Sequence, residues 1–127
     1  MRCGPETPAG GGAEPHKRYV AHVLRSALKA LLGESGLAVL EFHLNRRLRE
    51  DMYEVFYDDP HRFYNAMKNF FGSGVDAILR IIAQKLIEEG HIDVESPKAF
   101  VEVFNSPGEE SRQRLRKMFG HPEARVK

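Results

Sequence analysis

The sequence has almost no cysteine and no long hydrophobic run. Cys3 is the single cysteine, so an internal disulfide framework is excluded. No uninterrupted apolar stretch approaches the roughly 18 residues that suggest a membrane span. The N-terminal residues also lack the apolar run behind a basic start that marks a signal peptide. We therefore expect a cytoplasmic protein without a membrane segment.

Sequence motifs of catalysis and metal binding are missing as well. The sequence contains no GxSxG, Walker loop, CxxC or HExxH, and none of its six histidines lies three or four residues from another. The nearest approach to a metal site is a run of Glu88, Glu89, His91, Asp93 and Glu95. It straddles a predicted helix end, whereas hard cations need oxygens that converge on one point. We interpret the run as a solvated corner and predict a non-enzymatic protein with no catalytic residue, metal or cofactor.

Positive and negative charges nearly balance over the whole chain. The formal net charge is +1, so no global field steers the protein toward nucleic acid or an anionic membrane. The charges are nevertheless grouped locally. Residues 16–32 contain four Lys and Arg residues and no acid, and residues 50–61 contain five acids and no Lys or Arg. Function must therefore be sought in local patches.

The 127 residues fit one domain between two terminal segments. Residues 1–15 are rich in proline and glycine, and they contain too little apolar surface to offset the entropy lost on ordering. We predict a disordered leader over 1–15, a single helical domain over 16–120 and a flexible tail over 121–127.

Helix boundaries are marked by glycine at the ends and by capped prolines at the starts. Glycine takes the left-handed conformation that follows many helices at little cost, as expected for Gly33, Gly72, Gly90 and Gly120. Polar caps precede proline at Asp59-Pro60, Ser96-Pro97 and Ser106-Pro107, with Glu109 completing a capping box. At the Gly72-Ser73-Gly74 link we expect Ser73 to cap the next helix and Asp76 to complete a capping box. We favour this interpretation over an anion-binding site at the start of that helix.

These signals predict an all-α fold, an irregular or orthogonal bundle of five to six helices. The expected helices cover residues 16–32, 35–47, 60–71, 73–89, 97–105 and 108–119, and residues 50–59 are either a short helix or a loop. The helix at about 73–89 carries apolar residues on most of its faces, with Leu79 and Ile82 in its main stripe. We therefore place this hydrophobic helix at the centre of the bundle.

Two surfaces are candidates for function. Val39 and Phe42 point away from the apolar stripe of their helix, so they either pack under another helix of the chain or form an interface with a partner or a second copy. Arg18, Arg25 and Lys29 lie opposite the buried stripe of the first helix and can contact a polyanion. The isoelectric point of about 7.9 lies below the values above 9 that are typical of nucleic-acid-binding domains.

The segments ALKALLGESGLAVLEFHL and DDPHRFYNAMKNFFGSGVDAILRIIAQKL resemble a small archaeal helical family, the Nitrosopumilus output domain of signalling proteins. The resemblance covers about residues 24–88, and its most specific parts are the Leu-Gly-Glu-Ser turn and the Phe-Phe-Gly-Ser-Gly junction. It implies an all-helical fold with a regulatory or adaptor role, and it assigns no catalytic residues.

Our leading hypothesis is a non-enzymatic interaction or signal-output module that binds a protein partner or associates with itself. The alternative is a nucleic-acid-binding regulator that uses the basic face of the first helix.

Overall fold

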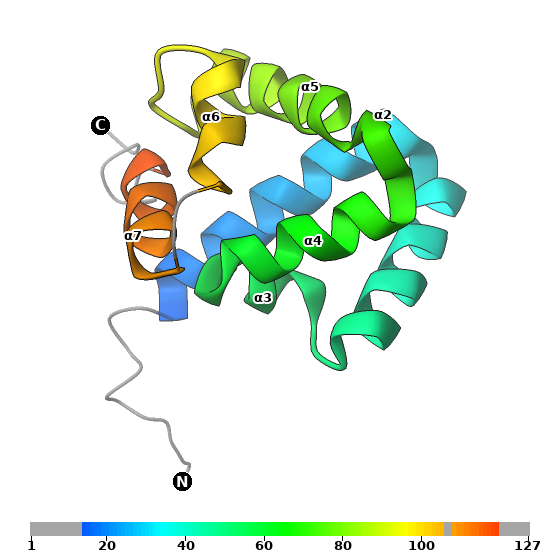
Figure 1. The fold of residues 1–127 in the computed structure, drawn as a ribbon. Coiled ribbons are helices and arrows are strands. Elements are labelled where there is room, and N and C mark those ends of the chain that lie inside the picture. The colour runs from blue at the N-terminus through cyan, green and yellow to red at the C-terminus, as the bar shows by residue number, and fades with distance from the viewer. Residues whose placement is uncertain (1–13, 106–107, 120–127) are drawn as a thin grey trace, which may run out of the picture.

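The computed structural model describes residues 14–105 and 108–119, and every named element in these ranges is a helix (Figure 1). The elements are α2 (Glu14–Leu48), α3 (Met52–Asp58), α4 (Pro60–Phe71), the 3-10 turn η2 (Gly72–Gly74), α5 (Val75–Glu88), α6 (Pro97–Val103) and α7 (Gly108–Met118). The all-α prediction is confirmed. None of the helices described is long and apolar enough to cross a membrane. The predicted tail, Gly120, Ser106-Pro107 and all but two residues of the predicted leader lie outside the described residues.

Helix α2 is two helical arms joined at Gly33, where sequence analysis predicted a helix end. Gly33 has φ 78° and ψ 171°, a combination that residues with a side chain rarely adopt. The first arm (residues 14–32) begins two residues earlier than expected, because Pro15 is tolerated in a first turn where its missing N–H has no partner. The second arm (residues 34–48) folds back, so that Arg25 and Glu41 come within 2.8 Å.

The predicted caps of α4 and α6 are confirmed. The Asp59 carboxylate accepts a hydrogen bond from the backbone N–H of Arg62 at 3.3 Å, and the Ser96 hydroxyl accepts one from the N–H of Ala99 at 3.2 Å. Each cap satisfies an amide that the helix itself leaves unpaired.

The predicted capping box at the start of α5 is wrong. Helix α5 begins at Val75 after the 3-10 turn, and its first turn has no side-chain cap. The carboxylate of Asp76 instead accepts a hydrogen bond from the hydroxyl of Tyr64 at 2.8 Å, which joins α5 to α4. Asp76 is therefore engaged across two helices rather than with the backbone.

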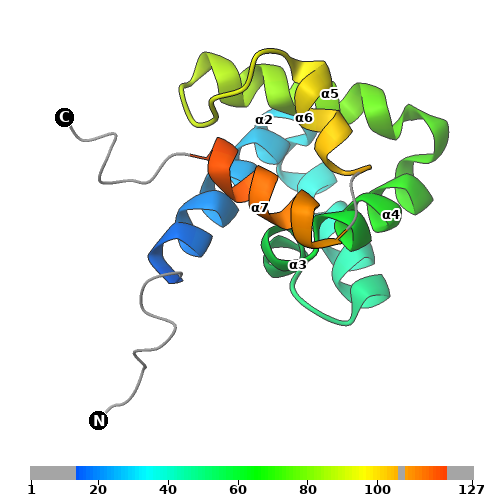
Figure 2. The same ribbon diagram turned by 60° about the vertical axis from the view of Figure 1, so that its left-hand side comes forward.

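The centre of the core is aromatic and lies around α3, the segment whose structure the sequence left open. Five of the seven residues of α3 are buried. The ring of Phe56 lies 4.9 Å from that of Phe63 and 6.0 Å from those of Phe104 and Phe119. Phe56 and Phe63 belong to α3 and α4, and Phe104 and Phe119 directly follow α6 and α7. Figure 2 shows α7 beside α3 and α4. Residues 52–58 are thus a short buried helix.

The expected central position of the hydrophobic helix at 73–89 needs correction. Leu79 and Ile82 of α5 are buried as predicted, but Ile81 is 52% exposed and its neighbour Arg80 is exposed too. Helix α5 packs mainly on α6 and on the first arm of α2, and it lies along one side of the bundle (Figure 1). The neighbouring helices do not cover all of the apolar surface of α5, so one face of this helix is exposed to solvent.

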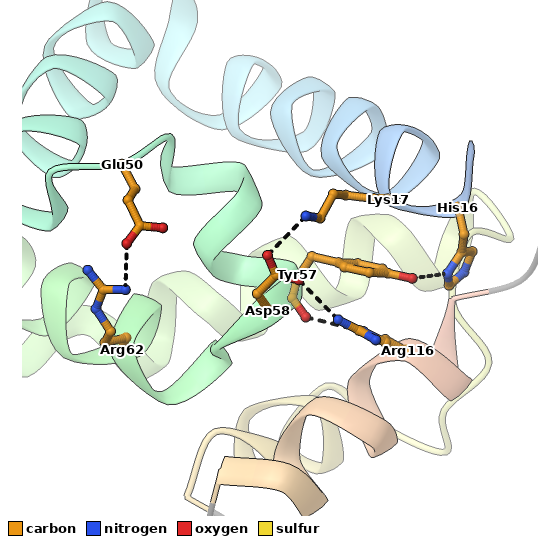
Figure 3. A network of polar contacts seen from close by, with 7 residues as sticks. All are labelled: His16, Lys17, Glu50, Tyr57, Asp58, Arg62 and Arg116. Atoms are coloured by element: carbon orange, nitrogen blue, oxygen red, sulfur yellow. Dashed lines mark hydrogen bonds and ion pairs between the residues drawn. The ribbon is translucent and has the colours of Figure 1, made fainter. Parts of the chain in front are cut away.

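A buried histidine fastens the start of α2 to α3 and to the end of α7 (Figure 3). His16 is 5% exposed, its Nε2 lies 3.3 Å from the carbonyl oxygen of Phe119 and its Nδ1 lies 2.8 Å from the hydroxyl of Tyr57. A carbonyl only accepts, so Nε2 is the donor, and in the neutral ring Nδ1 accepts from the tyrosine. Burial raises the pKa of Tyr57 above its usual range.

Beside this histidine, the carboxylate of Asp58 forms ion pairs with two cations (Figure 3). The Lys17 ammonium lies 2.9 Å from one carboxylate oxygen and the Arg116 guanidinium 3.1 Å from the other. Arg116 also covers the ring of Tyr57 at 4.0 Å. The same three elements are therefore joined a second time, at the surface.

Candidate interaction surface

The two residues predicted as an interface lie on the solvent side of the second arm of α2. Val39 is 50% exposed and Phe42 is 58% exposed. No described helix covers them, so the alternative in which they pack inside the domain does not hold for the described residues. Val39 and Phe42 are three positions apart on a helix and therefore form one continuous apolar strip.

This strip continues onto α4 through a row of rings. The ring of His43 lies 5.4 Å from Phe42 and 5.5 Å from Phe70, at the C-terminal end of α4. Phe70 is 40% exposed, although its spacing of seven residues from Phe63 and three from Met67 is typical of one buried helix face. We call Val39, Phe42, His43 and Phe70 the aromatic ridge.

Sequence reasoning missed Phe70 because two phenylalanines end α4 and only one of them packs on the core. Phe71 is partly buried against the core, and the ring of Phe70 stands against it at 4.8 Å, edge to face. A pair of adjacent aromatics at the end of a helix cannot both face one stripe, because consecutive side chains point about 100° apart. The adjacent pair Phe70-Phe71 therefore indicates, from the sequence alone, that one of the two rings points away from the core.

A groove of about 180 Å³ lies beside the aromatic ridge, between the second arm of α2 and α4. Leu44 and Ala66, which are 1% and 3% exposed, contribute apolar lining that belongs to the core. The rest of the lining comes from His43, Arg47, Asn69 and Phe70. A site of roughly 150 Å³ holds a benzene-sized group, so this groove has room for one large side chain next to Leu44 and Ala66.

Cations border the ridge and the groove. The guanidinium of Arg46 lies 5.9 Å from the centre of the Phe42 ring, and Arg47 lines the groove. Both side chains belong to exposed residues, and neither forms an ion pair with an acid of the described chain. The ridge thus combines uncovered rings with neighbouring positive charge that no acid of the described residues pairs with.

The basic face of the first arm is arranged differently, because the turn at Gly33 brings acids onto it. Arg25 pairs with Glu41 at 2.8 Å, and Lys29 pairs with Glu34 at 3.4 Å. Of the three predicted polyanion contacts only Arg18 is exposed without an ion pair in the described part of the chain. The sequence could not show this pairing, since the acids lie beyond the glycine.

Glu41 also binds a buried tyrosine. The hydroxyl of Tyr53 donates to the same carboxylate oxygen that receives Arg25, at 2.5 Å. Burial raises the pKa of Tyr53 well above its usual range, and the hydrogen bond to Glu41 raises it further. The same carboxylate raises the pKa of Arg25 by hydrogen bonding. Glu41 therefore holds the two arms of α2 and α3 together, and it is not available to repel or recruit a ligand.

The acidic corner at 88–95 shows no metal-site geometry. No group of three or more His, Cys, Asp or Glu residues in the described ranges is arranged to hold a metal ion. Glu89 pairs with Lys85 at 3.0 Å and lies 3.5 Å from His91, and the hydrogen bond from Lys85 lowers the pKa of Glu89. The hydroxyl of Tyr19 lies 3.0 Å from Nδ1 of His91.

Two other hollows lack the features of the groove at the ridge. A wide one of about 580 Å³ is lined by Asp93 and Glu95 together with Arg114 and Lys117, so its charges do not select one sign of ligand. A smaller apolar hollow of about 210 Å³ lies between the first arm of α2 and α5, next to Ile81. It has no aromatic lining.

Comparison with known proteins gives one match. The sequence profile of the family described as Nitrosopumilus output domain 5 matches residues 15–106, which include both arms of α2, α4 and the whole aromatic ridge. No curated protein and no solved structure matches the chain.

Proposed function

This chain belongs to the Nitrosopumilus output domain 5 family, and we propose that it is a non-enzymatic interaction module that binds a protein partner through the aromatic ridge. The observation that carries the proposal is the continuity of Val39, Phe42, His43 and Phe70 across two helices. Single exposed apolar residues are common on soluble proteins, whereas contiguous apolar patches bordered by polar residues mark binding sites.

The composition of the ridge supports this role. Aromatic residues and arginine are enriched at protein interfaces, where they contribute most of the binding energy, and lysine and acids are depleted. The ridge offers Phe42 and Phe70 as anchors, with Arg46 and Arg47 beside them. The buried residues Leu44 and Ala66 connect the ridge to the core, so the ridge is already ordered before binding. The entropy lost on ordering it in a complex is therefore small.

The ion pairs of the first arm count against the alternative of nucleic-acid binding. A phosphate that contacts Arg25 or Lys29 must compete with the carboxylates of Glu41 and Glu34. The phosphate contacts that give affinity for nucleic acid come from cations that are free to replace counterions. On this face only Arg18 is exposed without an ion pair in the described ranges, and a single cation supplies too few such contacts.

Quantitative affinity capture from the native host tests the proposal. The baits are the wild-type protein, Phe42→Asp, and Ile81→Asp, which changes an apolar residue of similar exposure on another helix. We expect a defined protein to be retained by the wild type and by Ile81→Asp and to be lost with Phe42→Asp. Equal retention by all three baits, or tight salt-dependent DNA binding that Arg18→Glu with Arg25→Glu abolishes, would refute the role of the ridge.

A further inference from the structure

We infer that the partner of the aromatic ridge is an acidic amphipathic helix, which places one large apolar side chain in the groove and a carboxylate against Arg47. This inference rests on the proposed function and adds the chemical class of the partner.

The shape of the site favours a helix. The groove lies between two helices, the second arm of α2 and α4, and the ridge contributes one lining residue from each, His43 and Phe70. An amphipathic helix that lies in such a groove inserts side chains at positions i, i+3 or i+4, and i+7. The part of the chain that the structure describes has no strand at its surface to which an extended segment could be added.

The charge around the site favours an acidic partner. Arg47 is the charged residue among those that line the groove, which include no Asp or Glu, and Arg46 lies beside the ring of Phe42. Arg62 is paired with Glu50 at 3.1 Å (Figure 3), and the two arginines at the ridge are not paired within the described ranges. A carboxylate of the partner supplies the charge that the domain lacks, and a guanidinium can bind it through two parallel hydrogen bonds.

The same charge argues against a second copy as the occupant. A symmetric dimer brings the same patch of each copy together. It would place the Arg46 and Arg47 of both protomers in one interface, where the lining of the groove offers no acid to pair with them, and uncompensated like charges at an interface are unfavourable. We therefore assign the ridge to a different, acidic chain.

Selection from a displayed library of random helical peptides tests this inference and does not require that the partner be identified. The three baits are the wild type, Arg46→Glu with Arg47→Glu, and Phe42→Asp, each first shown to melt within a few degrees of the wild type. We expect the wild type to enrich peptides with a large apolar residue and flanking Asp or Glu. The double arginine variant should prefer Lys or Arg flanks, with a change in relative affinity of about fivefold or more, and Phe42→Asp should enrich neither class.

The outcomes separate this inference from the function on which it rests. Peptides that need Phe42 but show no preference for acidic flanks would overturn the acidic partner and leave the ridge as a binding surface. Enrichment that survives Phe42→Asp, or no enrichment by any bait, would overturn the helix-binding inference, while affinity capture still tests the ridge. A dimer seen by light scattering that Phe42→Asp dissociates would show that a second copy is the occupant.

Discussion

The ring of His43 lies 5.5 Å from the ring of Phe70, and this contact joins the second arm of α2 to the end of α4 on the surface of the domain. The residues next to it, Leu44 and Ala66, are part of the core. The contact therefore connects a solvent-facing surface to a fixed framework, and it makes one ridge out of residues that are far apart in the chain.

Removal of the apolar surface at Phe42 should leave the fold intact. Phe42 is 58% exposed, so we expect Phe42→Asp to change the free energy of unfolding by no more than about 0.5 kcal/mol. Leu44→Ala, two residues along, removes a buried side chain and should cost about 2–5 kcal/mol. Urea denaturation measures both. A large loss of stability in Phe42→Asp would place this residue in the core and remove it from the interface.

The centre of the core should be found at α3 rather than at α5. Phe56→Ala opens a cavity beside the rings of Phe63, Phe104 and Phe119, and it should destabilise the protein by about 3–5 kcal/mol. Ile81→Ala removes an exposed side chain and should have little effect. Thermal denaturation followed by circular dichroism compares them. Similar losses in the two variants would mean that α5 is buried on all sides after all.

The turn between the arms of α2 depends on the backbone freedom of Gly33. A Cβ at this position would meet no neighbouring atom within 4 Å, so the cost of Gly33→Ala comes from its backbone conformation and should be about 1–3 kcal/mol. Gly74→Ala is the matched control, because Gly74 has φ −82° and equally open space. It should be neutral or stabilise by about 0.4–1 kcal/mol. Equal melting temperatures for the two variants would contradict the assigned turn.

Stability should fall in alkaline solution because buried tyrosines resist ionisation. Burial and the hydrogen bond to Glu41 raise the pKa of Tyr53, and the pKa values of Tyr57 and Tyr64 are also raised. Above about pH 10 the unfolded chain has lost phenolic protons that the native state keeps, so the free energy of unfolding decreases as the pH rises. Denaturation between pH 8 and 11 should show a shallower decrease in Tyr53→Phe than in the wild type. Parallel pH profiles would argue against the hydrogen bond between Tyr53 and Glu41.

The sequence predicted most helix boundaries because they are set by local chemistry. Asp59, Ser96 and Gly33 act within a few residues of themselves, and each has the predicted role. The position of a helix in the bundle depends on what covers it, which local pattern does not contain. The apolar faces of the helix at 73–89 therefore indicated a central helix, although Ile81 on one of these faces is 52% exposed.

The residues of the candidate sites also differ in whether local sequence or tertiary packing determines their environment. The outward direction of Phe42 follows from helical periodicity, whereas the participation of Phe70 depends on how α4 lies against the second arm of α2. The pairing of Arg25 with Glu41 depends on the reversal of the chain at Gly33, so the basic face appeared more open in sequence than it is in space.

Site-specific photo-cross-linking tests most directly that the aromatic ridge is the surface that contacts the partner. A photoreactive phenylalanine analogue is placed at Phe42 and, as a control of similar exposure, at Ile81 of α5, and both proteins are irradiated in cells of the native host. We expect one discrete heavier adduct from position 42 that weakens when Val39→Asp is added, and none from position 81. A discrete adduct from position 81 alone, or from neither position, would contradict the claim.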